Sequence, residues 1–419
     1  MFRKRDGDVA DAIADAHRRE WAYVLAATAR VACDIDLAEE CVQDAYVSAL
    51  EAWTRVGVPD NPGAWLTTAA RRKAIDALRR NQTLRTKLPL LVEPITDIGA
   101  ELSDEESIPD DRLRLVFTCC HPALAREAQV ALTLRLVCGL TTTEIAGAFL
   151  VSEPTMAARV TRAKKKISGA RIAYRVPEIH ELPDRLDAVL TVVHLLYTTG
   201  HTAPAGATLV RRDLVDRAID LARMLLALMP DEGEVRGLLA LLLLTNARAM
   251  TRTAPDGRLL LLDEQDRSRW DRDAIAEGLR LVLGALHAGR PGRFTLQAAI
   301  AAVHAEAPSY AETDWRQLLG LYDALLSRWP SPVVALNRAV PVAMLDGPAA
   351  ALAVVDDLAL DARLDGYRYL AAARADFLRR LGRWDEAIEA YQEALQHTEN
   401  DAERAFLTGR IAECADTLT

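Results

Sequence analysis

The chain has 419 residues, half of them apolar, and its 60 acidic residues outnumber its 51 basic ones, for a net charge of −9 at pH 7. This length predicts two to four domains, and the scarcity of glycine and aromatic residues beside alanine and leucine favours helices over sheets. The negative total argues against a general nucleic-acid binder, but local charge decides what a surface attracts. Residues 159–175 hold seven basic and no acidic residues, whereas residues 88–111 hold eight acidic and no basic ones.

The sequence gives no sign of secretion or of a membrane anchor. Its six cysteines lack the paired spacing of a zinc ribbon or of a disulfide framework. Residues 1–10 are charged rather than apolar, and the longest apolar run, residues 238–244, is too short to span a bilayer. We therefore expect a cytoplasmic, all-α protein without membrane contact.

The first helical block covers residues 6–80. Within residues 34–53, an apolar stripe at helical spacing consists of Ala38, Val42, Ala45, Ala49 and Trp53. The opposite face is polar and consists of Asp36, Glu39, Glu40, Gln43 and Asp44. A break at residues 57–63, with two prolines and two glycines, separates this helix from the next.

The helix predicted for residues 64–80 is strongly basic on one side. Its apolar face carries Leu66, Ala70 and Ala74, and its basic residues include Arg71, Arg72, Lys73, Arg79 and Arg80. Residues 81–111 contain three prolines and the acidic run, and this composition predicts a linker that is extended or loosely ordered.

A second block, residues 112–172, contains a candidate helix-turn-helix. A short helix from Thr142 to Phe149 precedes a turn at residues 150–152, where Ser152 suits an N-cap and Pro154 suits the first helical turn. The second helix has a buried stripe at Met156, Val160, Ala163 and Ile167, and a separate face with Thr155, Arg159, Arg162 and Lys166. A helix that buries one stripe and presents arginines beside it suits the major groove of DNA.

The rest of the chain, after a proline-bounded break at residues 176–183, has a helical repeat. Gly347 and Gly382 are 35 residues apart, and residues 381–395 place Gly382, Ala387, Tyr391 and Ala394 as tetratricopeptide (TPR) repeats do. The pattern predicts about three degenerate helix-hairpin repeats in residues 299–419, after a helical domain at residues 184–298. The concave face of such a solenoid is expected to bind either a partner protein or the chain's own DNA-binding modules.

Taken together, residues 36–53 (DLAEECVQDAYVSALEAW) and 61–80 (NPGAWLTTAARRKAIDALRR), the acidic linker and the helix-turn-helix resemble extracytoplasmic-function (ECF) sigma factors of RNA polymerase. The phrases at residues 117–124 (FTCCHPAL), 148–156 (AFLVSEPTM) and 186–200 (LDAVLTVVHLLYTTG) resemble a subgroup with a long TPR-like extension. The resemblance implies an all-α fold. Two small sigma-type domains, residues 1–80 and 112–175, would be joined by the acidic linker 81–111 and followed by the helical extension.

The resemblance also implies partners and site residues. The protein would bind core RNA polymerase, at the β′ clamp helices and the β flap, and promoter DNA. The polymerase-binding residues would be Asp36, Glu39, Glu40, Gln43 and Asp44. The minus-ten DNA would contact Asn61, Trp65, Arg71, Arg72, Lys73 and Arg79. The minus-thirty-five duplex would contact Ser152, Thr155, Ala158, Arg159, Arg162 and Lys166. Melted DNA needs a basic track and a flat side chain, and Trp65 with its neighbouring arginines supplies both.

Several alternatives stay open beside this interpretation. A helix-turn-helix regulator with a TPR-like sensor that never joins polymerase would explain the same hairpin, but it would not need the acidic helix. Trp65 could equally be a core aromatic residue. An enzyme within residues 177–300 would require a catalytic constellation, and none is evident, so we expect no enzyme and no cofactor.

Cys119, Cys120 and His121 lack a fourth ligand at zinc spacing, so no metal is expected there. His194 and His201 are expected to be core or turn residues.

Overall fold

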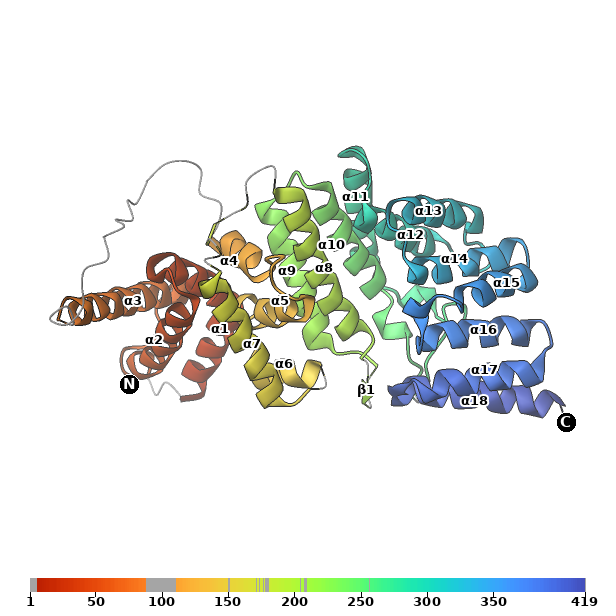
Figure 1. The fold of residues 1–419 in the computed structure, drawn as a ribbon, viewed down its shortest axis with the longest axis horizontal. Coiled ribbons are helices and arrows are strands. Elements are labelled where there is room, and N and C mark those ends of the chain that lie inside the picture. Colours follow the sequence, from red (N-terminus) through yellow and green to blue (C-terminus); the bar gives the residue numbers. More distant parts are fainter. Residues whose placement is uncertain are drawn as a thin grey trace. The chain divides into compact units, whose positions relative to one another are not determined.

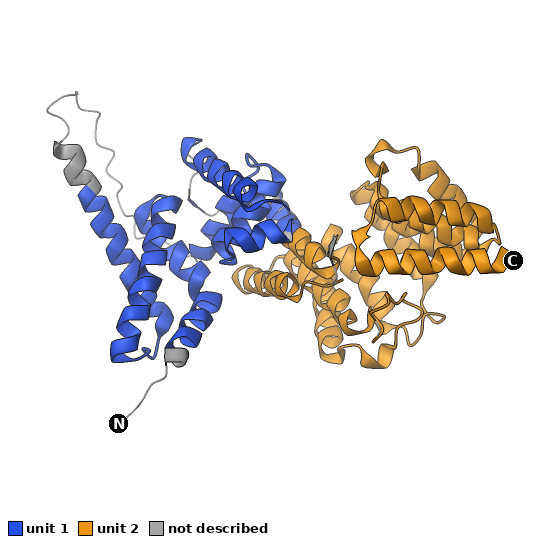
Figure 2. Cartoon of the chain, turned by 90° about the horizontal axis from the view of Figure 1, so that it is seen from below, with its two compact units in different colours: residues 1–192 blue, residues 193–419 orange. Residues whose placement is uncertain are grey.

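The computed structural model of the protein describes residues 6–87, 111–149, 151–170, 172, 174–175, 177, 181–203, 205–206, 209–255 and 257–418. Two compact units divide the chain, residues 1–192 and residues 193–419 (Figure 2). The described residues form helices with two very short strands, which confirms the predicted all-α fold. The acidic run of the predicted linker, apart from Asp111, lies outside the described residues.

Unit 1 consists of two groups of helices and the first part of α8. Its elements are α1 (Asp6–Ala32), α2 (Ile35–Val56), α3 (Pro62–Lys87), α4 (Asp111–Cys119), α5 (Arg126–Leu132), a π-helical turn (Thr133–Val137), α6 (Thr142–Ala148), α7 (Glu153–Gly169) and α8 (Leu182–His201), which crosses into unit 2. Helix α1 packs against α2 and α3, and on another side against α4. This packing buries the predicted stripe of α2, including Trp53.

Helix α3 is longer than the sequence predicts. It continues to Lys87, so residues 81–87, which were assigned to the start of the linker, are helical. The segment Asn81–Lys87 contains no proline or glycine, and a basic helix therefore has no local reason to end at Arg80. The first proline of the predicted linker is Pro89, two residues beyond the end of the helix. The linker therefore begins later than predicted.

Unit 2 begins within α8 and continues as stacked helices. Its further helices are α9 (Arg212–Leu228), α10 (Gly233–Asn246), α11 (Arg272–His287), α12 (Arg293–Glu306), α13 (Trp315–Arg328), α14 (Pro332–Leu345), α15 (Pro348–Leu358), α16 (Arg368–Arg380), α17 (Trp384–Gln396) and α18 (Asp401–Leu418). The apolar helix α10 packs against both α11 and α12. Gly237 makes the second contact possible, because a Cβ atom there would lie 2.6 Å from the backbone nitrogen of Thr295.

Helices α13 to α18 each pack against the next one along the chain, as in a helical solenoid (Figure 1). Gly382 has a φ of 74° in the turn between α16 and α17, a conformation that glycine adopts without a steric penalty. Ala387, Tyr391 and Ala394, the small and aromatic positions of the predicted repeat, are all buried in the core that these helices share. The residue pattern of the repeat therefore corresponds to its packing.

A short parallel strand pair joins distant parts of unit 2. Strand β1 (Ala205–Gly206), just after α8, pairs with β2 (Glu399–Asn400), just before α18. The buried side chain of Asn400 also donates a hydrogen bond of 3.1 Å to the carbonyl of Ala203. The segment that follows α8 is thus fixed to the last helix hairpin of the same unit.

Candidate nucleic-acid interface

In the helical hairpin α6–α7, each helix begins at a residue that caps it locally. Thr141 and Glu144 form a capping box, in which the Glu144 amide donates to Thr141 Oγ1 (3.2 Å) and the Thr141 amide donates to Glu144 Oε2 (2.7 Å). Ser152 caps α7 by accepting from the Thr155 amide at 3.4 Å, and Pro154 lies in the first turn. The role of Ser152 was predicted. The capping box was missed, although its Thr-x-x-Glu spacing is readable in the sequence.

Helix α7 has the two faces that its spacing predicts. Met156, Val160, Ala163 and Ile167 are buried, which confirms the predicted apolar stripe. The six residues assigned to the minus-thirty-five duplex lie away from this core. Ser152, Thr155, Ala158, Arg162 and Lys166 are exposed, and Arg159 is partly buried. The helix therefore presents hydroxyl and guanidinium groups to solvent near its start, in the manner of a recognition helix.

The basic helix α3 buries Leu66, Ala70 and Ala74 and leaves Arg72 and Arg79 exposed. Three other residues assigned to the minus-ten DNA have partners within unit 1. Asn61 accepts a hydrogen bond from the Ala64 amide (3.0 Å), Arg71 donates to the carbonyl of Ala27 (3.4 Å), and Lys73 lies 4.0 Å from Asp44.

Trp65 at the start of α3 is only partly buried. Its ring meets the buried ring of Trp53 edge to face, with 5.7 Å between centroids. Both interpretations of Trp65 thus find support, because one side packs on the core and the remainder is accessible. Such a ring can offer a stacking surface that the fold holds in place.

A contact with the second helix group buries one residue of the acidic face of α2 and leaves the others exposed. Asp36, Glu40, Gln43 and Asp44 are exposed, whereas Glu39 is 5% exposed. Glu39 binds Arg135 Nη2 at 2.5 Å and Lys164 Nζ at 2.6 Å, and Lys164 also binds Asp36 at 2.7 Å. We call this set of four residues, Asp36, Glu39, Arg135 and Lys164, the charge clasp.

Burial alone would lower the pKa of Lys164, but the hydrogen bonds that its ammonium donates to Asp36 and Glu39 outweigh burial and raise that pKa above its ordinary value. Two further hydrogen bonds hold the helix groups together. The Trp21 indole donates to the carbonyl of Leu136 (3.0 Å), and the Tyr174 hydroxyl donates to the carbonyl of Ala26 (3.1 Å). In this arrangement Glu39 is not accessible to a second protein.

The cysteines near the start of the second group are buried thiols. Burial raises the pKa of Cys119 well above its ordinary value and that of Cys120 to about 11, although Thr133, 3.4 Å from Cys120 Sγ, lowers the latter. In the part of the chain that the structure describes, no group of three or more His, Cys, Asp or Glu side chains is placed to hold a metal ion. None of the described helices is long and apolar enough to cross a membrane.

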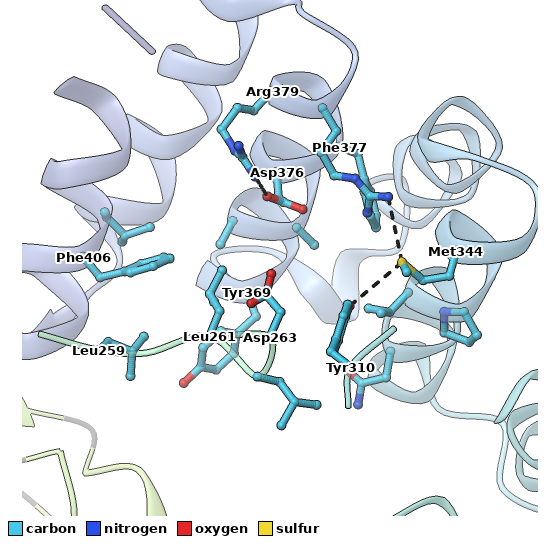
Figure 3. Close-up of a pocket in the computed structure, with 18 of the residues that line it drawn as sticks. Leu259, Leu261, Asp263, Tyr310, Met344, Tyr369, Asp376, Phe377, Arg379 and Phe406 are labelled. Atoms are coloured by element: carbon cyan, nitrogen blue, oxygen red, sulfur yellow. Dashed lines mark hydrogen bonds and ion pairs between the residues drawn. The ribbon is translucent and has the colours of Figure 1, made fainter. Parts of the chain in front are cut away.

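A cavity of about 740 Å³ in unit 2 opens among the solenoid helices. The extended segment 258–263 lies along one side of it and contributes Leu259, Leu261 and Asp263 (Figure 3). Tyr310, Tyr369 and other aromatic residues line the remainder. A leucine-rich segment of the same unit thus forms part of the cavity wall, which the sequence did not indicate.

Comparison with known families agrees with both helix groups of unit 1. The family described as Sigma-70 region 2 matches residues 14–83, and that described as Sigma-70, region 4 matches residues 114–167. In the extension, residues 185–286 match a Family of unknown function (DUF6596), and residues 372–405 match the Tetratricopeptide repeat. The three-helix bundle and the capped hairpin are thus regions 2 and 4 of a sigma-70 protein.

Whole-chain similarity extends beyond these regions. An uncharacterized protein of Rhizobium meliloti (strain 1021) is 44% identical over 379 residues, which cover 89% of each chain. A probable ECF RNA polymerase sigma factor, SigI, from two strains of Mycobacterium tuberculosis is 28% identical over 180 residues, 42% of this chain and 61% of that protein. The chain belongs to the ECF-like sigma factors and carries a TPR extension.

Proposed function

We propose that this sigma factor binds core RNA polymerase through the exposed acidic face of α2 and directs it to promoters. The basic side of α3 would hold the minus-ten strand, and the exposed face of α7 would bind the minus-thirty-five duplex. The observation that carries the proposal is that one compact unit presents all three polar faces on helices whose other sides are fixed in its core.

The direct test reverses a charge on the acidic face. Glu40 is exposed and forms no ion pair with any residue that the structure describes, so Glu40→Lys is expected to preserve the fold. We expect this variant to bind core polymerase at least about tenfold more weakly, because it places like charges against a complementary surface. Biolayer interferometry with purified core polymerase measures the effect.

Asp11→Lys is the matched control, because Asp11 is exposed on the neighbouring helix α1, outside the proposed surface. Equal binding of Glu40→Lys and the unaltered protein would favour the alternative, a helix-turn-helix regulator that does not join polymerase. Run-off transcription on DNA selected by the reconstituted enzyme then tests promoter recognition itself.

We further infer that the extension regulates initiation. The chain carries more than two hundred residues of helical structure beyond the two sigma regions, and this structure includes a large concave cavity. A fragment ending at Val192 keeps unit 1 whole, and circular dichroism checks that it remains helical. If its run-off activity equals that of the full chain at equal polymerase occupancy, the extension has no regulatory role.

A further inference from the structure

A second cavity in unit 2, about 500 Å³, adjoins the larger one and shares His304, Tyr322 and Asn337 with it. Its volume lies in the ordinary range of small-molecule sites. Its walls are mostly apolar and come from α8, α10, α12, α13 and α14 and from the segment before α11. They include Leu241, Trp270, Ile300, Leu325, Trp329 and Val334.

The charge of this cavity is unbalanced. Arg248, two residues after α10, lines it, and none of the described residues that line this cavity is acidic. The structure gives the guanidinium of Arg248 no hydrogen bond and no ion pair with any residue that it describes. Two other arginines add to the positive charge, because Arg252 and Arg267 lie close enough to interact electrostatically with Arg248.

Both neighbouring arginines donate hydrogen bonds to neutral groups. Arg252 donates to the Thr202 hydroxyl (3.0 Å) and to the carbonyl of His201. Arg267 donates from Nη1 to the carbonyls of His304 (2.6 Å) and Ala307 (2.7 Å), and its buried Nη2 has no partner among the described residues. Glu403 also interacts electrostatically with Arg252, but no described acidic residue lines the cavity beside Arg248.

The histidines of the cavity do not supply charge of either sign at neutral pH. Burial, together with Arg248 and Arg267, lowers the pKa of His304 to about 4. Burial and Arg293 lower the pKa of His194 to about 4 as well. Two further polar atoms in the wall, His304 Nδ1 and Gln297 Oε1, are buried without a hydrogen-bond partner in the described part of the chain. The cavity thus combines one cation, unused polar atoms and apolar walls.

Arg248 does not lose its positive charge by deprotonation, since a guanidinium stays protonated in proteins. Arg248 is partly buried, and an opposite charge stabilises a cation whose access to water is reduced. We propose that this cavity binds a small organic monoanion, a carboxylate attached to an apolar body, with the carboxylate on Arg248 and the body against Trp270 and Trp329. Arg248 and Trp270 lie within residues 185–286, which match a family of unknown function, whereas Trp329 lies outside that match.

This inference does not depend on polymerase binding, and its test needs only the purified full-length protein. Octanoate and hydrocinnamate are the probes, 1-octanol is the neutral analogue, and octyl phosphate is the alternative anion. Isothermal titration calorimetry gives affinity and stoichiometry, and the fluorescence of the tryptophans in the wall gives a second readout. We expect one carboxylate per chain, bound at least about tenfold more tightly than 1-octanol, as a charge-assisted hydrogen bond implies.

Three variants make the test specific. Arg248→Met should remove the preference for the carboxylate without lowering the melting temperature of the free protein, because it removes an unpaired charge. Arg248→Lys should keep part of that preference. Arg290→Met, at an exposed arginine after α11, is the matched control and should bind as the unaltered protein does.

The proposal is wrong if neither carboxylate binds saturably, if octanoate and 1-octanol bind with equal affinity, or if Arg248→Met keeps the preference. It is also wrong if octyl phosphate binds and both carboxylates do not, since the site would then accept a different class of anion.

Discussion

The Glu39 carboxylate forms two ion pairs, and each of its oxygens contacts a different cationic side chain. Arg135 contacts Oε1 and Lys164 contacts Oε2. The Glu39 side chain is 6% exposed and the Lys164 side chain is 12% exposed. Removal of one member of a buried ion pair typically costs about 3–5 kcal/mol, because the remaining charge stays buried without a partner. The charge clasp is therefore a specific contact between regions 2 and 4, unlike the exposed ion pairs elsewhere on the molecule.

The sign of the Lys164 shift determines which conditions release the charge clasp. A lysine whose pKa is raised by folding contributes stability that is fully present below its unfolded value, about 10.4. That contribution is lost only as the pH rises through the still higher folded value. A rise within the physiological range therefore does not discharge Lys164. Competition by another charged surface, such as a polymerase subunit, is the more effective means of release.

The cysteines differ in accessibility, which predicts an order of chemical modification. Cys33 is exposed, whereas Cys119 and Cys120 are buried with raised pKa values. The thiolate is the reactive form, so we expect iodoacetamide at pH 8 to alkylate Cys33 at least about a hundredfold faster than either buried cysteine. Peptide mass spectrometry of a native time course measures the order. Early labelling of Cys120 would contradict the protonated, buried thiol described above.

At the scale of helices, close packing of α10 on α12 depends on one glycine. Gly237→Ala would place a Cβ 2.6 Å from the backbone nitrogen of Thr295, which cannot move like a side chain. Glu234 strengthens the same junction, because its carboxylate accepts from the amides of Phe294 (2.9 Å) and Thr295 (3.1 Å) at the start of α12. We expect Gly237→Ala to destabilise unit 2 by about 1–3 kcal/mol, in the range of overpacked cores.

Gly320 offers a matched control for this substitution. It is exposed in the middle of α13, and nothing lies within 4 Å of a Cβ added there. Gly320→Ala is therefore expected to stabilise unit 2 by up to about 1 kcal/mol, through helix propensity alone. Urea unfolding followed by circular dichroism compares the two variants. Equal effects of the same sign would show that the α10–α12 junction is less tightly packed than the structure indicates.

Local signals in the sequence predicted most features of single helices. The stripe of α7 follows from its spacing, and the cap at Ser152 depends on residues three positions apart, so both could be predicted. The partners of Glu39 could not, because Lys164 is 125 residues away and hydrophobic patterning carries no information about such pairs. The unbalanced charge at Arg248 was hidden for the same reason. Its neighbours come from several helices, and a local sequence window does not contain them.

For the whole molecule, we expect the charge clasp to compete with polymerase for Glu39. A variant with Lys164→Gln and Arg135→Gln retains the shape of both side chains in part but not their charge. We expect it to bind core polymerase about tenfold more tightly in the absence of DNA, because a larger fraction of molecules then exposes Glu39. Biolayer interferometry measures this affinity, with Arg162→Gln on the exposed face of α7 as the control. Weaker binding than in the unaltered protein would mean that the contact does not compete with polymerase.

The strand pair β1–β2 has a consequence for the order in which the protein is completed. Residues 205–206 find their partners only when residues 399–400 have left the ribosome, and α18 follows directly after them. At about 5–20 residues per second, residues 1–192 are synthesised roughly 10–40 seconds before that partner strand. Each newly made chain therefore passes through an interval in which unit 1 can already be folded while unit 2 is still incomplete. Pulse labelling of nascent chains would show how the sigma regions behave before the extension is completely synthesised.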